Sequence, residues 1–94
     1  MADVTGNLRQ LIEKHLIHRG RRAANCRVFA PAGLGRSYTV ILEEAGIREQ
    51  FFIESKEVER YAETGNDQFV LNPIRTGVRN LDRMVTKKKT ARGR

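Results

Sequence analysis

The sequence predicts a single small α+β domain in which helices pack against an antiparallel sheet centred on a hairpin at residues 36–54. Apolar residues recur every three or four positions near the N-terminus, as they do on one face of an amphipathic helix. Two runs of alternating apolar and polar residues flank Ala45-Gly46, which is typical of a hairpin. A chain of 94 residues can bury one modest core but not two. The expected order of elements is α-β-β-β-α-β-α.

The N-terminal elements follow from apolar spacing and from glycine. We expect the first helix over residues 5–18, and we expect Gly20 to end it in the left-handed backbone that glycine adopts easily. The next segment, RGRRAANCR, is expected to form an exposed basic loop. Residues 26–30 are prone to form a short strand, which Pro31 and the following glycines end.

The hairpin is the most strongly indicated element. Residues 36–44 and 47–54 alternate in polarity on either side of a two-residue turn. This alternation directs Phe51 into the core and Phe52 to the opposite face, where an aromatic ring could stack on a base of a single strand.

The C-terminal elements are expected to be a helix, a strand and a helix. Ser55 is suited to cap a helix that stops at Gly65, and QFVLN at residues 68–72 indicates a short strand ended by Pro73. Helical spacing returns over residues 77–87. The core is then expected to contain Leu8, Leu11, Ile12, Leu16, Val28, Val40, Leu42, Phe51, Ile53, Val58, Tyr61, Val70, Leu81 and Val85.

Positive charge is distributed unevenly along the chain. Residues 1–36 carry seven Lys or Arg and two acids, residues 37–67 carry three and eight, and residues 68–94 carry eight and one. The local net charges are therefore +5, −5 and +7. Five of the cations lie in the last eight residues, KKKTARGR, and we expect residues 87–94 to form a flexible basic tail outside a domain of residues 1–86. Such clustering favours binding to a polyanion.

Two clusters of basic residues are candidates for contact with phosphates. In the third helix, basic residues four apart would form a ridge that continues into the tail, and a second cluster lies in the loop after the first helix. The ridge and tail residues are Arg75, Arg79, Arg83, Lys87, Lys88 and Lys89, and the loop cluster is Arg19, Arg21, Arg22 and Arg27. Alternatively, the ridge is an ordinary solvated helix face, and the loop arginines pair with the acidic middle of the chain, especially Glu57, Glu59 and Glu63. The sequence does not decide whether the two clusters share one face.

These features predict a non-catalytic protein that binds nucleic acid or another polyanion largely through electrostatics. No helix-turn-helix, zinc finger or ribonucleoprotein motif is visible, so sequence-specific recognition is not expected. The alternative is a protein-interaction or self-associating module, in which the acidic middle of one chain meets the basic ends of another. DNA, RNA and a protein partner all remain open as the binding partner.

Several other functions lack support in the sequence. No residue spacing indicates a catalytic triad, and Cys26 is the only cysteine, so no internal disulfide can form. His15, His18 and Cys26 lack the second ligand pair of a zinc site, and no cofactor or small-molecule substrate is implied. The longest apolar runs have three residues, far short of a membrane span, and we expect a cytoplasmic protein.

Overall fold

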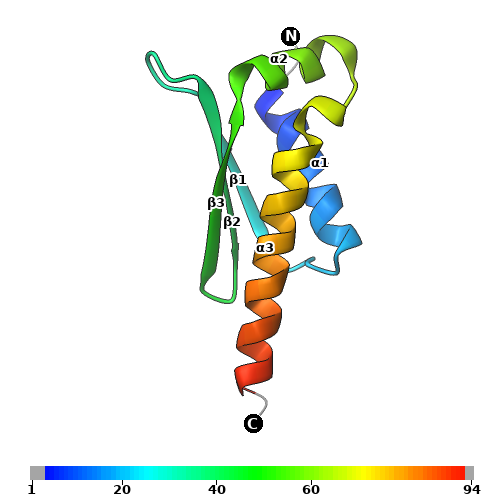
Figure 1. Ribbon diagram of the computed structural model, residues 1–94, viewed down its shortest axis with the longest axis vertical. Coiled ribbons are helices and arrows are strands. Elements are labelled where there is room, and N and C mark those ends of the chain that lie inside the picture. Colours follow the sequence, from blue (N-terminus) through cyan, green and yellow to red (C-terminus); the bar gives the residue numbers. More distant parts are fainter. Residues whose placement is uncertain (1–3, 93–94) are drawn as a thin grey trace.

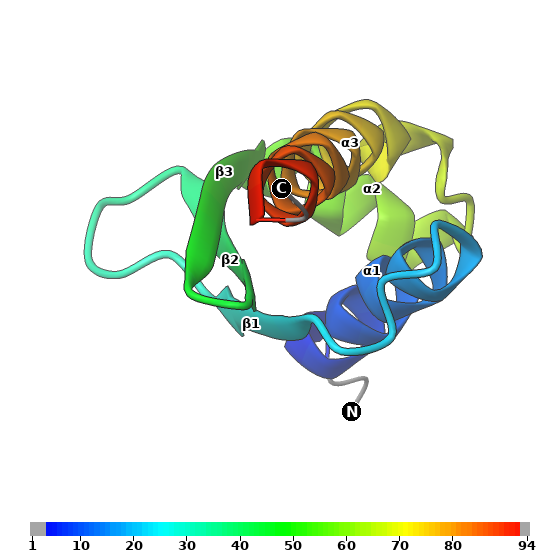
Figure 2. The same cartoon turned by 90° about the horizontal axis from the view of Figure 1, so that it is seen from below.

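The computed structural model describes residues 4–92, with side chains to Lys88. Within these residues, helices cover one face of a three-stranded antiparallel sheet and leave the other face open (Figures 1 and 2). The elements are α1 (Val4–His18), β1 (Asn25–Phe29), β2 (Ser37–Glu44), β3 (Ile47–Glu54), α2 (Ser55–Thr64) and α3 (Gln68–Arg92). The predicted α+β class, with its sheet around the 36–54 hairpin, is confirmed.

A tight turn fixes the register of the hairpin. Glu44 pairs with Ile47, so only Ala45 and Gly46 connect β2 to β3. Their φ angles are 55° and 79°, and both therefore lie in the left-handed region that a two-residue hairpin turn requires. Strand β1 pairs with the other edge of β2, which completes the sheet order β1-β2-β3.

The core forms where α1 and α3 meet the inner face of the sheet. Most predicted core residues are buried, and Leu11, Val28, Phe51 and Tyr61 are partly buried against them. The prediction missed three buried hydrophobic residues, which are Cys26, Ile74 and Val78.

The predicted strand at residues 68–72 is wrong, because α3 begins at Gln68 and runs through Pro73. Proline removes one helical hydrogen bond, the one that its amide would have donated to Phe69. The side chain of Asn66 accepts a hydrogen bond at 3.0 Å from the amide of Gln68 and so stabilises the start of the helix. The buried residues keep helical spacing across the proline, at Val70, Ile74, Val78, Leu81 and Val85. The order is therefore α-β-β-β-α-α.

The C-terminal segment is helical where the sequence predicted a flexible tail. Helix α3 reaches Arg92, and the segment from Lys87 to Arg92 contains neither glycine nor proline to interrupt it. Lys88 Nζ donates a hydrogen bond at 2.6 Å to the carbonyl of Ala45 in the hairpin turn. Gly93 and Arg94 lie outside the described residues. No described helix, α3 included, is long and apolar enough to cross a membrane.

Helix α2 ends as predicted but begins differently. Gly65 has a φ of 73°, and its amide donates to the carbonyl of Tyr61, which closes the helix. Glu54, and not Ser55, occupies the N-cap position, and its side chain makes no capping hydrogen bond. The hydroxyl of Ser55 is buried without a hydrogen-bond partner.

A partly buried ion-pair network ties the loop after α1 to the sheet and to α3. Arg21 Nη1 lies 3.2 Å from Glu44 Oε2, and Arg21 Nε lies 3.3 Å from Asp82 Oδ1. The side chain of Arg21 is only 15% exposed and that of Glu44 only 9%. Arg19 Nη1 pairs with the second oxygen of Asp82 at 3.2 Å. The loop was predicted to be exposed, but Arg21 is held inside this network.

Gly77 allows α3 to lie close to β3. A Cβ atom at this position would overlap the ring of Phe51, which projects from β3 toward the helix. On the same side of α3, Asn80 Nδ2 donates to Glu49 Oε2 of β3 at 3.2 Å. The position of α3 over the sheet therefore depends on a residue without a side chain.

We expect Gly77→Ala to lower the free energy of unfolding by about 1–2 kcal/mol, because the overlap with Phe51 outweighs the better helix propensity of alanine. Urea denaturation measures this change. Thr76→Ala, at the exposed neighbouring position, is the control and should leave stability unchanged or slightly higher. A more stable Gly77→Ala protein would contradict the close approach.

Arg21→Met should lower the free energy of unfolding by about 2–3 kcal/mol, because it leaves Glu44 buried without its cation. The double variant Arg21→Met/Glu44→Leu should recover much of this loss, since no unpaired charge remains buried. Arg48→Met breaks the exposed pair with Glu43 and should cost under about 1 kcal/mol. Equal losses from Arg21→Met and Arg48→Met in denaturant titrations would show that the network contributes little.

Candidate anion-binding site

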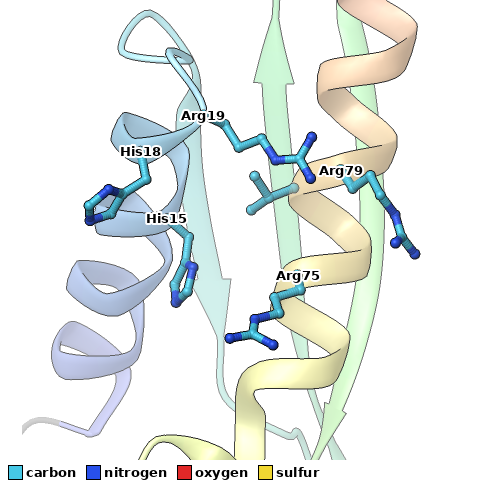
Figure 3. A pocket seen from close by; sticks show the side chains of 6 residues that line it. His15, His18, Arg19, Arg75 and Arg79 are labelled. Carbon is cyan, nitrogen blue, oxygen red and sulfur yellow. The ribbon is translucent and has the colours of Figure 1, made fainter.

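A pocket of about 290 Å³ lies between the C-terminal part of α1 and the middle of α3 (Figure 3). Its lining consists of His15, His18, Arg19, Arg75, Val78 and Arg79. Five of these six residues carry basic side chains, and no carboxylate lines the pocket. A concave surface lined in this way attracts anions.

The basic side chains approach the pocket from both helices. Arg75 reaches from α3 toward α1, where the ring of His15 lies, and Arg19 reaches across from the other direction toward α3 (Figure 3). Arg79 and His18 point away from each other at the two sides of the pocket. The groups best placed to meet one bound anion are therefore His15, Arg19 and Arg75.

The last carbonyl groups of α1 have backbone hydrogen-bond partners in the turn that follows the helix. The last carbonyls of a helix carry partial negative charge when they have no partner. Here the carbonyl groups of His15, Leu16 and Ile17 accept hydrogen bonds from the backbone amides of Arg19, Gly20 and Arg21. The turn at Gly20, whose φ is 78°, makes this arrangement possible.

His15 is the titratable group that the pocket perturbs. Burial lowers its pKa below the usual value of 6.5, and the positive charge of Arg75 lowers the pKa further, while Asp67 acts in the opposite direction. His15 is therefore mostly neutral at pH 7 in the absence of a ligand.

The predicted ridge on α3 is present, and it winds around the helix. Arg75, Arg79, Arg83 and Lys87 are all exposed, and none forms an ion pair with a described residue. Each step of four residues rotates by about 40°, so Lys87 lies about 120° around the helix from Arg75. The ridge therefore starts beside α1 and turns outward along α3.

The structure separates the loop cluster. Arg19 joins the pocket, Arg21 is held by Glu44 and Asp82, and Arg22 borders a separate hollow that includes Glu13. Arg27 follows buried Cys26 in β1 and is exposed on the open face of the sheet, opposite the helices. The two clusters thus share a face only through Arg19.

The alternative, in which these arginines pair with the acidic middle of the chain, holds for Arg21 through Glu44 but not for the glutamates of α2. The carboxylates that hold Arg19 and Arg21 are Glu44 and Asp82. Helix α2, with Glu57, Glu59 and Glu63, lies at the top of the molecule in Figure 1, whereas the loop lies near its middle.

The remaining candidate residues are Lys88 and Lys89. Lys88 donates to the hairpin turn, and its side chain is thus partly committed to holding α3 against β2 and β3. The side chain of Lys89 lies outside the described part of the structure.

The open face of the sheet is a poor surface for a polyanion. Phe29 and Phe52 are 49% and 57% exposed, and they lie in one row across the sheet with Thr39 between them. The charges on this face have both signs, because Arg48 pairs with Glu43 at 3.4 Å and Glu54 is also exposed. Phe52 lies on the predicted face, but away from the basic ridge.

The sequence analysis rejected a metal site at His15 and His18 and assigned them no other function, so it missed their place in the pocket. The sequence signal that could have identified this place is that both histidines lie in the last turn of the helix. Among residues 4–92, no group of three His, Cys, Asp or Glu side chains is arranged to hold a metal ion. Burial raises the pKa of the Cys26 thiol to about 12, so this thiol is not a reactive nucleophile near neutral pH.

The chain was also compared with known proteins. This comparison covered models of protein families, curated protein sequences and solved structures. No match was found in any of the three comparisons.

Proposed function

We propose that this protein binds nucleic acid through the surface formed by the pocket and the α3 ridge, without catalysing a reaction. The supporting observation is that four exposed cations along α3 have no carboxylate partner among the described residues, whereas Arg19 and Arg21 do. Cations left without partners create a positive potential that a phosphate backbone can neutralise.

The form of the surface favours contact with the backbone over contact with bases. Arg75, Arg79, Arg83 and Lys87 rise along α3 in steps of about 6 Å, so they can follow a row of phosphates. The stacking candidate Phe52 lies on the open face of the sheet, away from this row. The affinity should therefore depend weakly on the nucleic-acid sequence and strongly on the salt concentration.

Two glutamates of α2 would lie far from a nucleic acid bound along the C-terminal part of α3. Glu57 and Glu63 belong to α2, at the opposite end of the molecule from the C-terminal part of α3 (Figure 1). The lone reduced cysteine, Cys26, is compatible with action in the cytoplasm.

A paired charge-removal experiment tests this interface. Arg79→Gln/Arg83→Gln removes two ridge cations, and Arg27→Gln/Arg48→Gln removes the same charge from the open face of the sheet. We expect the ridge variant to bind a fluorescent oligonucleotide at least about tenfold more weakly, with the log-log salt slope reduced by about 2. The sheet variant should bind nearly as tightly as the wild type.

Fluorescence anisotropy with single-stranded and duplex DNA and RNA, at several salt concentrations, gives these values. An affinity that does not change with salt, or equal losses in the two variants, would contradict the proposed interface. If no nucleic acid binds and light scattering shows a dimer that dissociates in high salt, the self-associating module is the correct function.

A further inference from the structure

We propose that the pocket between α1 and α3 binds a single phosphate group and that His15 takes up a proton when the phosphate binds. The inference rests on the proposed function, since it assigns one specific contact within that interface. It adds a chemical class of ligand for the pocket and a dependence of binding on pH.

The shape and lining of the pocket fit a small oxyanion. A volume of about 290 Å³ is at the lower end of the range for ligand pockets, which suits a phosphate with part of its sugar and not a larger molecule. Arg75 offers a planar fork of N–H donors from α3, and this fork matches two oxygens of a phosphate. His15 faces Arg75 from α1 and can add a third donor (Figure 3).

Arg19 provides the third side of the site. Its side chain is 46% exposed and is already extended toward α3, where it contacts Asp82. Arg21 holds the same carboxylate from the buried side, so Asp82 keeps a cation if Arg19 turns to a bound phosphate.

The charges around His15 explain the coupling to a proton. The charged groups near His15 are Lys14 and His18 on α1, Arg19 in the loop, Arg75 and Arg79 on α3, and Asp67 before α3. Without a ligand, burial and Arg75 together disfavour the protonated ring. A phosphate bound between His15 and Arg75 neutralises that repulsion and stabilises the imidazolium. Affinity should therefore rise as the pH falls through the pKa of His15.

Isothermal titration calorimetry with sulfate tests this inference directly. Sulfate resembles phosphate but remains a dianion throughout the titration range of histidine, so any pH dependence belongs to the protein. At low ionic strength, we expect the affinity to be about five- to tenfold higher near pH 5.5 than near pH 8. Titrations in buffers of different ionisation enthalpy should show net proton uptake near pH 7.

Two histidine variants separate the proposed residue from its neighbour. His15→Gln should remove most of the pH dependence, whereas His18→Gln, on the outer side of the pocket, should retain most of it. Arg75→Gln should weaken sulfate binding at every pH. Circular dichroism at each pH checks that the variants remain folded. A pH-independent affinity in the wild type, or the same pH dependence in His15→Gln, would overturn the inference.

The source of the phosphate follows from a comparison of oligonucleotides. Tighter binding of a 5′-phosphorylated strand than of the same strand with a 5′-hydroxyl would identify a terminal phosphate, and equal binding would identify an internal one. The two proposals can fail separately. Proton-linked sulfate binding without oligonucleotide binding would refute only the nucleic-acid function, and oligonucleotide binding with no effect of His15→Gln would refute only this inference.

Discussion

The packing of one face of α3 against the sheet and α1 determines where its charged residues lie. Val70, Ile74, Val78, Leu81 and Val85 are fully or almost fully buried, so they fix the rotation of the helix about its axis. The close approach at Gly77 fixes its distance from β3. The basic residues can then occupy only the remaining arc of the helix. Because that arc begins beside α1 at Arg75, the same packing that forms the core also forms the pocket.

Positive charge is concentrated on the side of α3 that borders α1 because the two carboxylates near it already pair with cations. Asp82 and Glu44 together hold Arg19 and Arg21, and this group of four residues is close to neutral as a whole. The network also anchors the loop that carries Arg19. What remains unneutralised is the series of cations on α3. Partly buried ion pairs of this kind thus separate the basic residues that hold the fold from those free to meet a ligand.

Local sequence signals were sufficient for most of the fold but not for the site. The periodicity of α1 and the turn at Ala45-Gly46 are short-range features, and both were predicted correctly. Pro73 interrupted an apolar run and suggested a strand, whereas helical spacing from Val70 to Val85 identifies one helix. Which side a residue faces depends on tertiary packing. Arg19 and Arg27 are close in sequence, yet Arg19 lies against α3 from the loop after α1, whereas Arg27 lies in β1 on the open face of the sheet.

The two arginines that pair with Asp82 differ in how readily they can change partner. Arg19 is 46% exposed, so water already competes for its guanidinium, and its pair with Asp82 contributes little to stability. Arg21 is 15% exposed and also contacts Glu44, so moving it would leave the buried carboxylate of Glu44 without a cation. A phosphate in the pocket therefore competes with Asp82 for Arg19 alone. The loop stays anchored through Arg21 while Arg19 changes partner, and the pocket can fill without unfolding the segment that builds it.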